Sequence, residues 1–528
     1  MPNDCISYTD SGYFIPIVTD YLDQKAELKP LFNRFPTLDN FGPQIIEKEL
    51  NYRGSREILV SALKTQYQHI KISTPTADNI SSLLNTKTFT VTTGHQLNLF
   101  TGPLYFLYKI VTTINLAKAL QKEYPENRFV PVYWMATEDH DFEEINYFNF
   151  NGKKFRWNRK SAGAVGRLST DGLEEFFRVF SAELGNGINA DALRQLFSDT
   201  YLKHNSLSDA TRFLADALFG KYGLVIIDGD HADLKKQFIP FIKEELLQQT
   251  SYKCVSETIQ SLSSYDIQVK PREINLFYLG DNLRERIILK DGLYHVNNTE
   301  IVFSQRAILS ELKASPEKFS PNVILRPLYQ EVILPNLCYI GGGGELAYWF
   351  ELKSFFDSVN TTFPIMMLRN SVLIAKEKQA LKADKLNLTW AELFLSPVAL
   401  SNKKIHEFSQ FQLDFTRQKD FLKQQFFEFH AIASQTDPSF RGAVNAQEKK
   451  QINGLENLEK KLIKAEKRKY ADQLERIAIL HEALFPNGGL QERFANFTEM
   501  YLHAGNHFIE KLIAELNPME DQFTITII

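Results

Sequence analysis

The chain has 528 residues, of which 44% are hydrophobic and 23% charged, and its formal net charge is −4. A chain of this length exceeds one simple core, so two or three domains are expected. Because acidic and basic residues nearly balance, no global positive field attracts a polyanion, and a nucleic-acid partner is disfavoured. The three cysteines are far apart in the sequence and form no CxxC pair, which is typical of a reducing cytosol and argues against a cysteine-rich zinc site.

The first residues lack the basic and apolar regions of a signal peptide. No run approaches the roughly 20 apolar residues that span a bilayer. These features predict a cytoplasmic protein without a membrane partner. No metal site is predicted, because carboxylate spacing alone does not identify a site for a hard metal ion.

The N-terminal part is predicted to contain helices followed by a strand–helix–strand unit. Residues 1–85 are mostly polar and have helical periodicity. Thr88–Thr93 has the β-branched pattern of a strand and is followed by Gly94. Pro103–Leu120 is predicted to be a helix with proline at its first position, and Phe129–Met135 a second strand. This spacing is that of a crossover between parallel strands.

The middle of the chain contains a third strand and two predicted insertions. Residues 151–220 combine basic, glycine-containing turns with helical segments. Gly223–Asp228 is continuously apolar, like a buried parallel strand, and a helix is expected to follow it to about Gln249. Residues 265–305 alternate between apolar and polar side chains, which predicts a small antiparallel insertion.

Two further strands complete the predicted core. Asn336–Ile340 is followed by the turn Gly341–Gly344 and by a helix from Glu345, and Phe363–Leu368 is predicted to be the last short strand. The alternation of strands and helices predicts an α/β fold, namely a Rossmann-like, doubly wound parallel sheet with two insertions.

The C-terminal part has the pattern of long helices. Residues 398–437 contain no Gly and no Pro, and a second apolar seam follows Pro438. In the first stretch, apolar residues recur every seven positions: Phe408, Phe415, Leu422 and Phe429. Two long helices joined by a short connection are predicted to form an antiparallel coiled-coil hairpin. Such a hairpin leaves apolar surface uncovered, so we expect it to pack on the core or to form a homodimer.

The expected domain boundaries follow these changes in pattern. The segments are 1–150 (N-terminal helices and first half of the core), 151–220 (connecting insertion 1), 221–250 (core strand and helix), 251–320 (connecting insertion 2), 321–375 (second half of the core), 376–485 (coiled coil) and 486–528 (a segment packing back on the core).

The most informative feature of the sequence is an acidic cluster after the Phe129–Met135 strand. Five carboxylates and one imidazole occur within residues 138–144. Asp141 and Glu144 have capping-box spacing, so part of this acidity is expected to start a helix. Glu143 is favoured in the first turn of that helix. Glu138, Asp139 and His140 have no folding explanation and are suited to bind an ammonium group, act as a general base or hold Mg²⁺. The catalytic candidates are Glu138, Asp139, His140 and Asp141.

Glycine-containing segments at other strand ends are predicted to bind a substrate or nucleotide. The segment Thr93–Tyr105 leads into a helix whose free N–H groups attract phosphate or carboxylate; a capped helix start with a packed aromatic face is the alternative. The Gly341–Gly344 turn lets the backbone approach a ligand closely, or it is only a tight strand-to-helix turn. The candidates here are Gly94, Gln96, Thr101, Gly102, Tyr105, Gly341, Gly342, Gly344 and Glu345.

Two further segments near strand ends contain candidate binding residues. Asp228 and Asp230 follow the third strand and precede His231, and a turn with a satisfied histidine is the alternative explanation. Arg326 is a candidate fork for a carboxylate or phosphate, and a structural ion pair with Glu331 is its alternative.

Several motifs, taken in order, resemble the bacillithiol biosynthesis cysteine-adding enzyme family. They are Thr93–Gly94, Leu99–Leu104, Glu138–Phe142, Arg326–Leu328, Gly344–Trp349, Leu368–Ser371, Leu484–Gly488 and Leu490–Arg493. The resemblance runs over essentially the whole chain. It implies ligation of the L-cysteine carboxyl group to the glucosamine amine of glucosaminyl-malate. It also implies a Rossmann core of the class I aminoacyl-tRNA-synthetase-like nucleotidyltransferase type and a homodimer through the coiled coil.

The same resemblance suggests that ATP activates the cysteine carboxylate as an adenylate, with phosphates held after Gly102 and near the Gly341–Gly344 turn. His95 stands where the family usually has glutamine, so it is not assigned as an essential base. Two alternatives remain: a related adenylate-forming enzyme that joins a different amino acid to a small amine, and a non-enzymatic dimeric coiled-coil scaffold.

Overall fold

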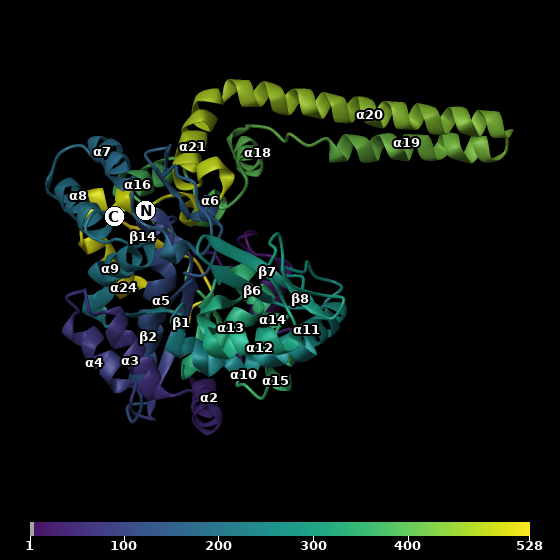
Figure 1. The fold of residues 1–528 in the computed structure, drawn as a ribbon. Coiled ribbons are helices and arrows are strands. Elements are labelled where there is room, and N and C mark those ends of the chain that lie inside the picture. Colours follow the sequence, from purple (N-terminus) through teal and green to yellow (C-terminus); the bar gives the residue numbers. More distant parts are fainter. Residues whose placement is uncertain (1–4) are drawn as a thin grey trace. The chain divides into compact units, whose positions relative to one another are not determined.

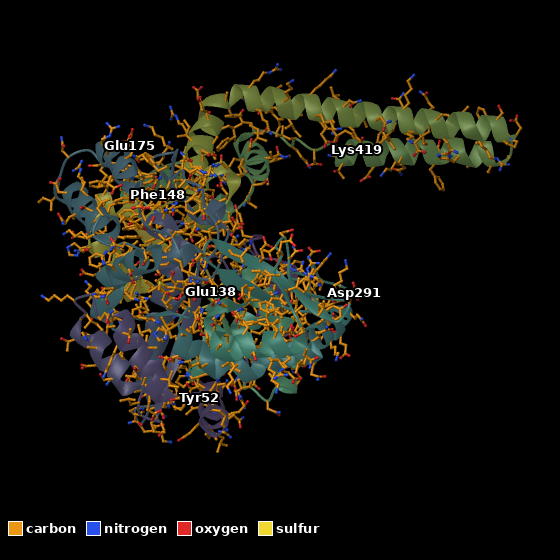
Figure 2. The ribbon with its side chains drawn as sticks, in the orientation of Figure 1. Tyr52, Glu138, Phe148, Glu175, Asp291 and Lys419 are labelled. Carbon is orange, nitrogen blue, oxygen red and sulfur yellow. The ribbon has the colours of Figure 1, made fainter. Side chains whose placement is uncertain are left out.

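The computed structural model describes residues 5–528, whose ribbon is shown in Figure 1. The chain divides into two compact units. The smaller consists mainly of residues 375–490, and the larger of residues 7–374 together with 491–526. Side chains cover both units throughout (Figure 2).

Helices precede the sheet, as the periodicity of the first 85 residues predicts. They are α1 (Pro16–Leu22), α2 (Leu38–Asn51), α3 (Arg56–Gln66) and α4 (Thr74–Ser82). Ser55 caps α3 and Ser73 caps α4, each through a side-chain oxygen that accepts a backbone N–H of the first turn. Phe41 and Ile45 of α2 are buried in the apolar core beside the sheet.

A five-stranded parallel sheet forms the centre of the larger unit, in the order β12-β11-β1-β2-β5. Its strands are β1 (Thr88–His95), β2 (Arg128–Met135), β5 (Val225–Asp228), β11 (Asn336–Gly341) and β12 (Ile365–Leu368). The predicted strands and their parallel pairing are confirmed. The chain runs from β1 outward to β2 and β5, then returns to the other side of β1. This reversal creates a switch point between β1 and β11, where ligands of open α/β sheets bind at the carboxyl ends of the strands.

Helix α5 (Tyr105–Glu123) forms the crossover between β1 and β2. The prediction that Pro103 is its first residue is wrong, because the helix begins at Tyr105. Pro103 instead pairs with Asn496 in a β-bridge, and the Leu104 N–H donates to the Ala495 carbonyl oxygen. These contacts hold the chain before the first helical turn.

The segment between β2 and β5 begins with the acidic cluster. Its elements are α6 (Phe142–Ile145), β3 (Tyr147–Phe150), β4 (Lys153–Arg156), α7 (Leu173–Glu183), α8 (Ile188–Tyr201) and α9 (Leu207–Phe219). Strands β3 and β4 form an antiparallel hairpin. Phe100, Phe148, Phe180 and Phe197 pack ring against ring there, so this part has an aromatic core.

The segment between β5 and β11 carries the second sheet. It contains α10 (Ala232–Gln248), α11 (Thr250–Ser261), β6 (Leu276–Gly280), β7 (Leu283–Lys290), β8 (Leu293–Val296), β9 (Val302–Phe303), α12 (Gln305–Ala314), β10 (Phe319–Pro321) and α13 (Leu325–Ile333). The five strands pair in the order β10-β6-β7-β8-β9, and every pair is antiparallel. The predicted antiparallel segment is confirmed, and β10 extends it beyond its predicted end at residue 305.

The remaining elements of the larger unit close the fold. They are α14 (Gly343–Phe350), α15 (Lys353–Ser358), β13 (Val372–Ala375), α22 (Gln491–Phe494), α23 (Phe497–Ala504), α24 (His507–Glu515) and β14 (Thr524–Ile527). Strands β13 and β14 form a separate two-stranded sheet. The prediction that Phe363–Leu368 is the last strand is therefore wrong. Residues 372–375 and 524–527 become strands by pairing with each other. The local sequence pattern of each segment does not distinguish a strand from a loop.

The smaller unit is helical. Its helices are α16 (Glu377–Lys385), α17 (Trp390–Leu393), α18 (Pro397–Phe408), α19 (Thr416–Ser434), α20 (Pro438–Lys469) and α21 (Ala471–Leu484). Helices α19 and α20 lie side by side (Figure 1). Lys419 pairs with Glu459 and His430 with Glu448, so the two helices meet in reverse order.

The predicted first long helix and its heptad seam are corrected by the structure. The helical stretch is interrupted between Phe408 and Thr416, and Phe429 is 50% exposed. The side chains buried between α19 and α20 are Phe426, Ala433 and Val444, and of the predicted seam Leu422 packs against them, partly buried. Four phenylalanines lie within residues 421–429, so several apolar registers fit the pattern and only packing against α20 selects one.

The chain also contains short 3-10 helices at Ala26–Leu31, Leu99–Thr101, Val165–Arg167, Gly220–Tyr222, Pro316–Lys318 and Pro486–Gly488. Within residues 5–528 we find no helix with the length and apolar character that a membrane crossing requires.

Candidate functional site

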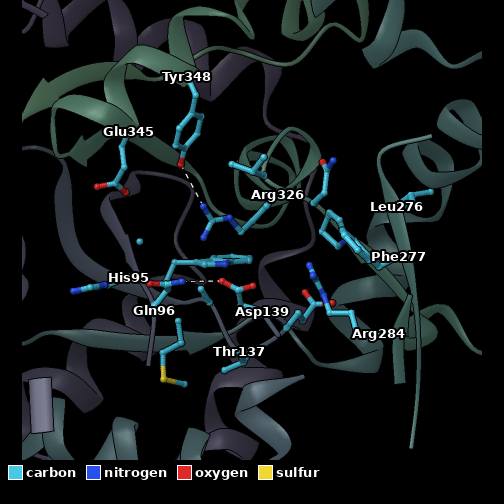
Figure 3. Close-up of a pocket in the computed structure, with 18 of the residues that line it drawn as sticks. His95, Gln96, Thr137, Asp139, Leu276, Phe277, Arg284, Arg326, Glu345 and Tyr348 are labelled. Atoms are coloured by element: carbon cyan, nitrogen blue, oxygen red, sulfur yellow. Dashed lines mark hydrogen bonds between the residues drawn. The ribbon is translucent and has the colours of Figure 1, made fainter. Parts of the chain in front are cut away.

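A cavity of about 640 Å³ lies at the carboxyl ends of β1 and β2. This size is typical of small-molecule sites. From the parallel sheet and its turns it is lined by Gly94, His95, Gln96, Tyr105, Lys109, Trp134, Met135, Ala136, Thr137, Glu138, Asp139, Glu345 and Tyr348. The opposite wall comes from the antiparallel sheet and the segments beside it (Figure 3). The cavity therefore lies beside the switch point between β1 and β11, where the strand order predicts a ligand.

Asp139 is held as a carboxylate in the wall of this cavity. Gln96 Nε2 donates to Oδ2 at 3.0 Å, and the backbone N–H of His140 donates to Oδ1 at 2.8 Å. Burial raises the pKa of Asp139, but hydrogen bonds from His140 and Gln96 and the Arg284 cation together hold it well below its usual range. Asp139 is thus ionised at neutral pH. It suits an ammonium ligand and is too weakly basic to deprotonate one.

Glu138 has the opposite electrostatic environment. Its side chain is 13% exposed and pairs with Lys235, which is completely buried. Lys235 also donates to the Phe319 carbonyl oxygen at 2.8 Å. Burial raises the pKa of Glu138, and the Lys235 cation only partly offsets the effect. Of the two neighbouring carboxyl groups, Glu138 therefore has the raised pKa that general bases need.

Glu345 organises the turn after β11. It pairs with Lys109 at 2.5 Å, accepts the Tyr339 hydroxyl at 2.7 Å and accepts the Gly342 N–H at 2.9 Å. Lys109 also donates to the Gly94 carbonyl oxygen at 2.6 Å. A Cβ at Gly94 would lie 2.9 Å from the Tyr339 hydroxyl oxygen, so a larger residue there would displace this hydroxyl, which donates to Glu345. These contacts tie β1 to β11 at the edge of the cavity.

Arg326 points into the cavity (Figure 3), and its recorded side-chain partner is the Tyr348 hydroxyl, to which Nη2 donates at 3.3 Å. The alternative ion pair with Glu331 is wrong, because Glu331 pairs with Lys48 at 2.9 Å. Within residues 5–528 no carboxylate lies within ion-pair distance of Arg326. A partly buried guanidinium that forms no ion pair favours binding of an anion.

His140 and Asp141 do not line the cavity. His140 is exposed, and its Nδ1 accepts a hydrogen bond from Arg284 at 2.7 Å. Asp141 caps α6 by accepting the Glu144 N–H at 3.3 Å, as its spacing predicts. Of the four catalytic candidates, Glu138 and Asp139 face the cavity.

The turn before α5 also lies outside the cavity. Gly102 has φ 61°, and a Cβ there would lie 2.6 Å from the Asn98 Cβ, so this glycine is needed for the turn. Its carbonyl oxygen accepts a hydrogen bond from Asn496 at 2.6 Å. Thr101 is buried with φ 70°. Tyr105, at the start of the helix, does line the cavity.

The other glycine and aspartate candidates support the site without lining it. Gly341 ends β11, Gly342 is the N-cap of α14 and Gly344 lies in the first turn of that helix, and none of the three lines the cavity. Asp228 accepts the Asp230 N–H at 2.8 Å and a short hydrogen bond from Thr137. Burial and the neighbouring Asp230 raise the pKa of Asp228 to about 6. Asp230 pairs with Arg167 at 2.7 Å.

Sequence reasoning missed the cations of the opposite wall. They are Lys270, Arg272, Arg284 and Arg286. Arg284 and Arg286 are two positions apart in β7, so both point to the same face of the antiparallel sheet. That spacing was visible in the sequence, but nothing local indicates that this face meets the carboxyl edge of the parallel sheet. Within residues 5–528 no group of three or more His, Cys, Asp or Glu side chains could hold a metal ion.

Family models match both parts of the chain. The model described as "Bacillithiol biosynthesis BshC, N-terminal Rossmann-like domain" matches residues 1–370. The model described as "Bacillithiol biosynthesis BshC, C-terminal coiled-coil domain" matches residues 372–528.

Relatives from other bacteria are similar over nearly the whole length. A Flavobacterium johnsoniae protein named "Putative cysteine ligase BshC" is 63% identical, covering 99% of this chain and 99% of its own. A Bacillus anthracis protein of the same name is 28% identical, covering 94% of this chain and 95% of its own. A solved Campylobacter jejuni structure, named a putative arginyl-tRNA synthetase, aligns at 11% identity over 84% of this chain and 98% of its own, with a TM-score of 0.21 that supports no argument. With both domain models and full-length relatives in agreement, the chain belongs to the BshC family of bacillithiol biosynthesis.

Proposed function

We propose that this protein is a ligase that joins the carboxyl group of L-cysteine to the glucosamine amine of glucosaminyl-malate, the last step of bacillithiol biosynthesis. Membership of the family and the printed names of the relatives support a cysteine-adding role. One observation carries the proposal: a single cavity presents an ionised aspartate and an arginine that forms no ion pair within residues 5–528.

These two side chains match the two charges of an α-amino acid. We assign the cysteine ammonium to Asp139, which is anionic and hydrogen-bonded into position by Gln96. The cysteine carboxylate is assigned to Arg326, whose planar fork binds carboxylate and phosphate oxygens in pairs. Figure 3 shows both side chains directed toward the same space, with Gln96 beside Asp139.

Amide formation also requires an activated carboxyl group and a neutral amine. In the proposed route the cysteine carboxylate attacks the α-phosphorus of ATP and displaces pyrophosphate. The sugar amine then attacks the acyl carbon, AMP leaves, and Glu138 accepts the amine proton. Holding amine and adenylate together is worth ~7–11 kcal/mol of the barrier. The Rossmann-like fold is compatible with ATP, and the assignment to the class I synthetase-like type, together with a cytoplasmic location, is part of this proposal.

Replacing Asp139 by asparagine is expected to raise the KM for cysteine about 10- to 100-fold, because one charge-assisted hydrogen bond is lost. The kcat should change less. The measurement is cysteine-dependent amide formation followed by mass spectrometry. The matched control is Asp141→Asn, an exposed cap whose loss should leave this KM within about twofold.

An unchanged KM for cysteine in the Asp139→Asn variant would remove this residue from ammonium binding. If the unaltered protein joined another amino acid to an amine but not cysteine, the related adenylate-forming activity would replace the proposed one. If no amino acid were joined, the scaffold alternative would gain support.

We also propose that the smaller unit forms a homodimer. Helix α19 exposes Phe421, Phe427, Phe429 and Ile432, each at least half exposed. Large exposed apolar side chains favour contact with a second apolar surface over contact with water. Sedimentation is expected to give the mass of a dimer, and the Phe421→Ser, Phe427→Ser variant that of a monomer. Ile46→Ser, which removes an equally exposed apolar side chain from α2, should leave the dimer intact. A monomeric unaltered protein at micromolar concentration would contradict the proposal.

A further inference from the structure

The charge of the cavity is unbalanced. Its lining contains six Lys and Arg side chains but three Asp and Glu side chains. Two of the three acidic side chains already form ion pairs: Glu345 with Lys109, and Glu138 with Lys235. Lys235 is not among the residues that line the cavity. A single amino-acid carboxylate at Arg326 therefore leaves most of the positive charge without a partner.

The surplus is gathered on one wall, which we call the basic wall: Lys270, Arg272, Arg284 and Arg286. Lys270 and Arg272 lie in the segment before β6, and the two other arginines lie on β7. Within residues 5–528 no ion pair is recorded for Lys270, Arg272 or Arg286. Because like charges repel, surface charges are normally interspersed by sign, so four converging cations favour a multiply charged anion.

Arg284 is the most constrained member of the basic wall. Its guanidinium carbon lies 3.9 Å from the centre of the Phe277 ring, and Nη1 donates to His140 Nδ1 at 2.7 Å. Its Nε is buried and has no hydrogen-bond partner in the described part of the chain. A guanidinium that is fixed from one side and unsatisfied on the other is already oriented for an anionic oxygen.

We propose that the basic wall binds the two carboxylates of the malate portion of the amine substrate, and so selects glycosides with a dicarboxylate aglycone; this rests on the proposed function. The chemistry of the wall fits carboxylates or phosphates. Its position favours carboxylates. Phosphates of Rossmann-like folds bind at the glycine-containing turns that lead from a parallel strand into a helix, whereas the basic wall comes from β7 and the segment before β6, and its Arg284 contacts His140 after β2. Figure 3 shows Arg284 and Phe277 on one side and Glu345 and Tyr348 on the other.

The malate glycoside also fits the geometry of the reaction. In a glucosamine glycoside, the amine and the aglycone are carried on adjacent sugar carbons. An amine placed next to cysteine, which is bound between Asp139 and Arg326, therefore puts the aglycone within reach of a neighbouring wall. Because the wall comes from β7 and the segment before β6, it contacts the aglycone rather than the reacting atoms, so its residues determine specificity rather than catalysis.

The test replaces Arg286 by glutamine and measures three KM values: for glucosaminyl-malate, for methyl glucosaminide, which has the same amine with a neutral aglycone, and for ATP. Loss of one charge-assisted contact is expected to raise the KM for glucosaminyl-malate about 10- to 100-fold. The kcat/KM for methyl glucosaminide and the KM for ATP should stay within about twofold. Lys290→Gln, an exposed cation on the same strand outside the cavity, is the matched control and should change none of them.

Calorimetric titration with glucosaminyl-malate adds a readout that does not depend on turnover. Weaker binding to the Arg286→Gln variant than to the unaltered protein supports the basic wall even if no amide is formed, an outcome that contradicts only the proposed function. A rise in the KM for ATP alone would assign the wall to phosphates and overturn the inference. Equal effects on the two glycosides, or no effect on either, would overturn it as well. Circular dichroism verifies that each variant is folded.

Discussion

An Arg326→Gln variant is expected to lose about 10²- to 10³-fold in kcat/KM for amide formation, the range seen when one oriented donor to a reacting anionic group is removed. Its free energy of unfolding should change by no more than about 1 kcal/mol, because the substitution breaks one hydrogen bond, to the Tyr348 hydroxyl, and no ion pair. The physical reason is that this guanidinium has no carboxylate partner among residues 5–528, so the folded protein does not depend on its charge. Steady-state kinetics and urea unfolding measure the two quantities.

Arg326→Lys is the informative companion variant. It keeps the charge but loses the planar fork, so it should recover only part of the activity. Full recovery would mean that charge alone is needed and that paired hydrogen bonds are not. A loss of several kcal/mol of stability with normal kinetics would show that Arg326 is a structural residue.

Arg369→Gln is expected to have the opposite result, a loss of about 3–5 kcal/mol of unfolding free energy, because it leaves a buried carboxylate without its partner. Arg369 is 5% exposed and Glu492 1%, and Nη2 lies 2.6 Å from Oε1. Arg369 Nη1 also donates to the Asn370 carbonyl oxygen at 2.9 Å. Urea or thermal unfolding measures the loss.

The control for this variant is Arg178→Gln. Arg178 pairs with Glu175 at a similar distance, but both side chains are more than 60% exposed, so its loss should change stability by less than about 1 kcal/mol. The double replacement Arg369→Met with Glu492→Leu should recover much of the stability, since no charge is then left buried. Equal losses for the buried and the exposed arginine would contradict this account.

The strands of the parallel sheet were predictable because buried parallel strands are continuously apolar. Phe129–Met135 and Gly223–Asp228 show this pattern, whereas Thr88–Thr93 is recognised by its β-branched residues, and each leads into polar residues or glycine. Strand ends in such sheets meet at one edge, so the placement of Asp139 beside the end of β1 also follows from the sequence. The first residue of the helix after Pro103 and the heptad seam of the long helices were not predictable. Several helix starts and several apolar registers fit the local sequence, and tertiary contacts select one of them.

Within the acidic cluster, the sequence could not separate the roles of neighbouring carboxylates. Glu138 and Asp139 are adjacent, yet the pKa of one is raised and that of the other lowered. The difference arises from Lys235, which is 97 positions from Glu138, and from Gln96, which is 43 positions from Asp139. No local pattern encodes such partners.

The sequence by itself determined the fold class, the family and the edge of the sheet where polar groups gather, because these depend on short-range periodicity and on motifs in a fixed order. Only the tertiary structure decided which side chains face the cavity, which of them form ion pairs or hydrogen bonds with other residues, and which cations have no ion-pair partner. Glu331, five positions from Arg326, pairs with Lys48 and not with that arginine. The ionisation and availability of a side chain depend on burial and on distant charges, and the folded chain alone brings these together.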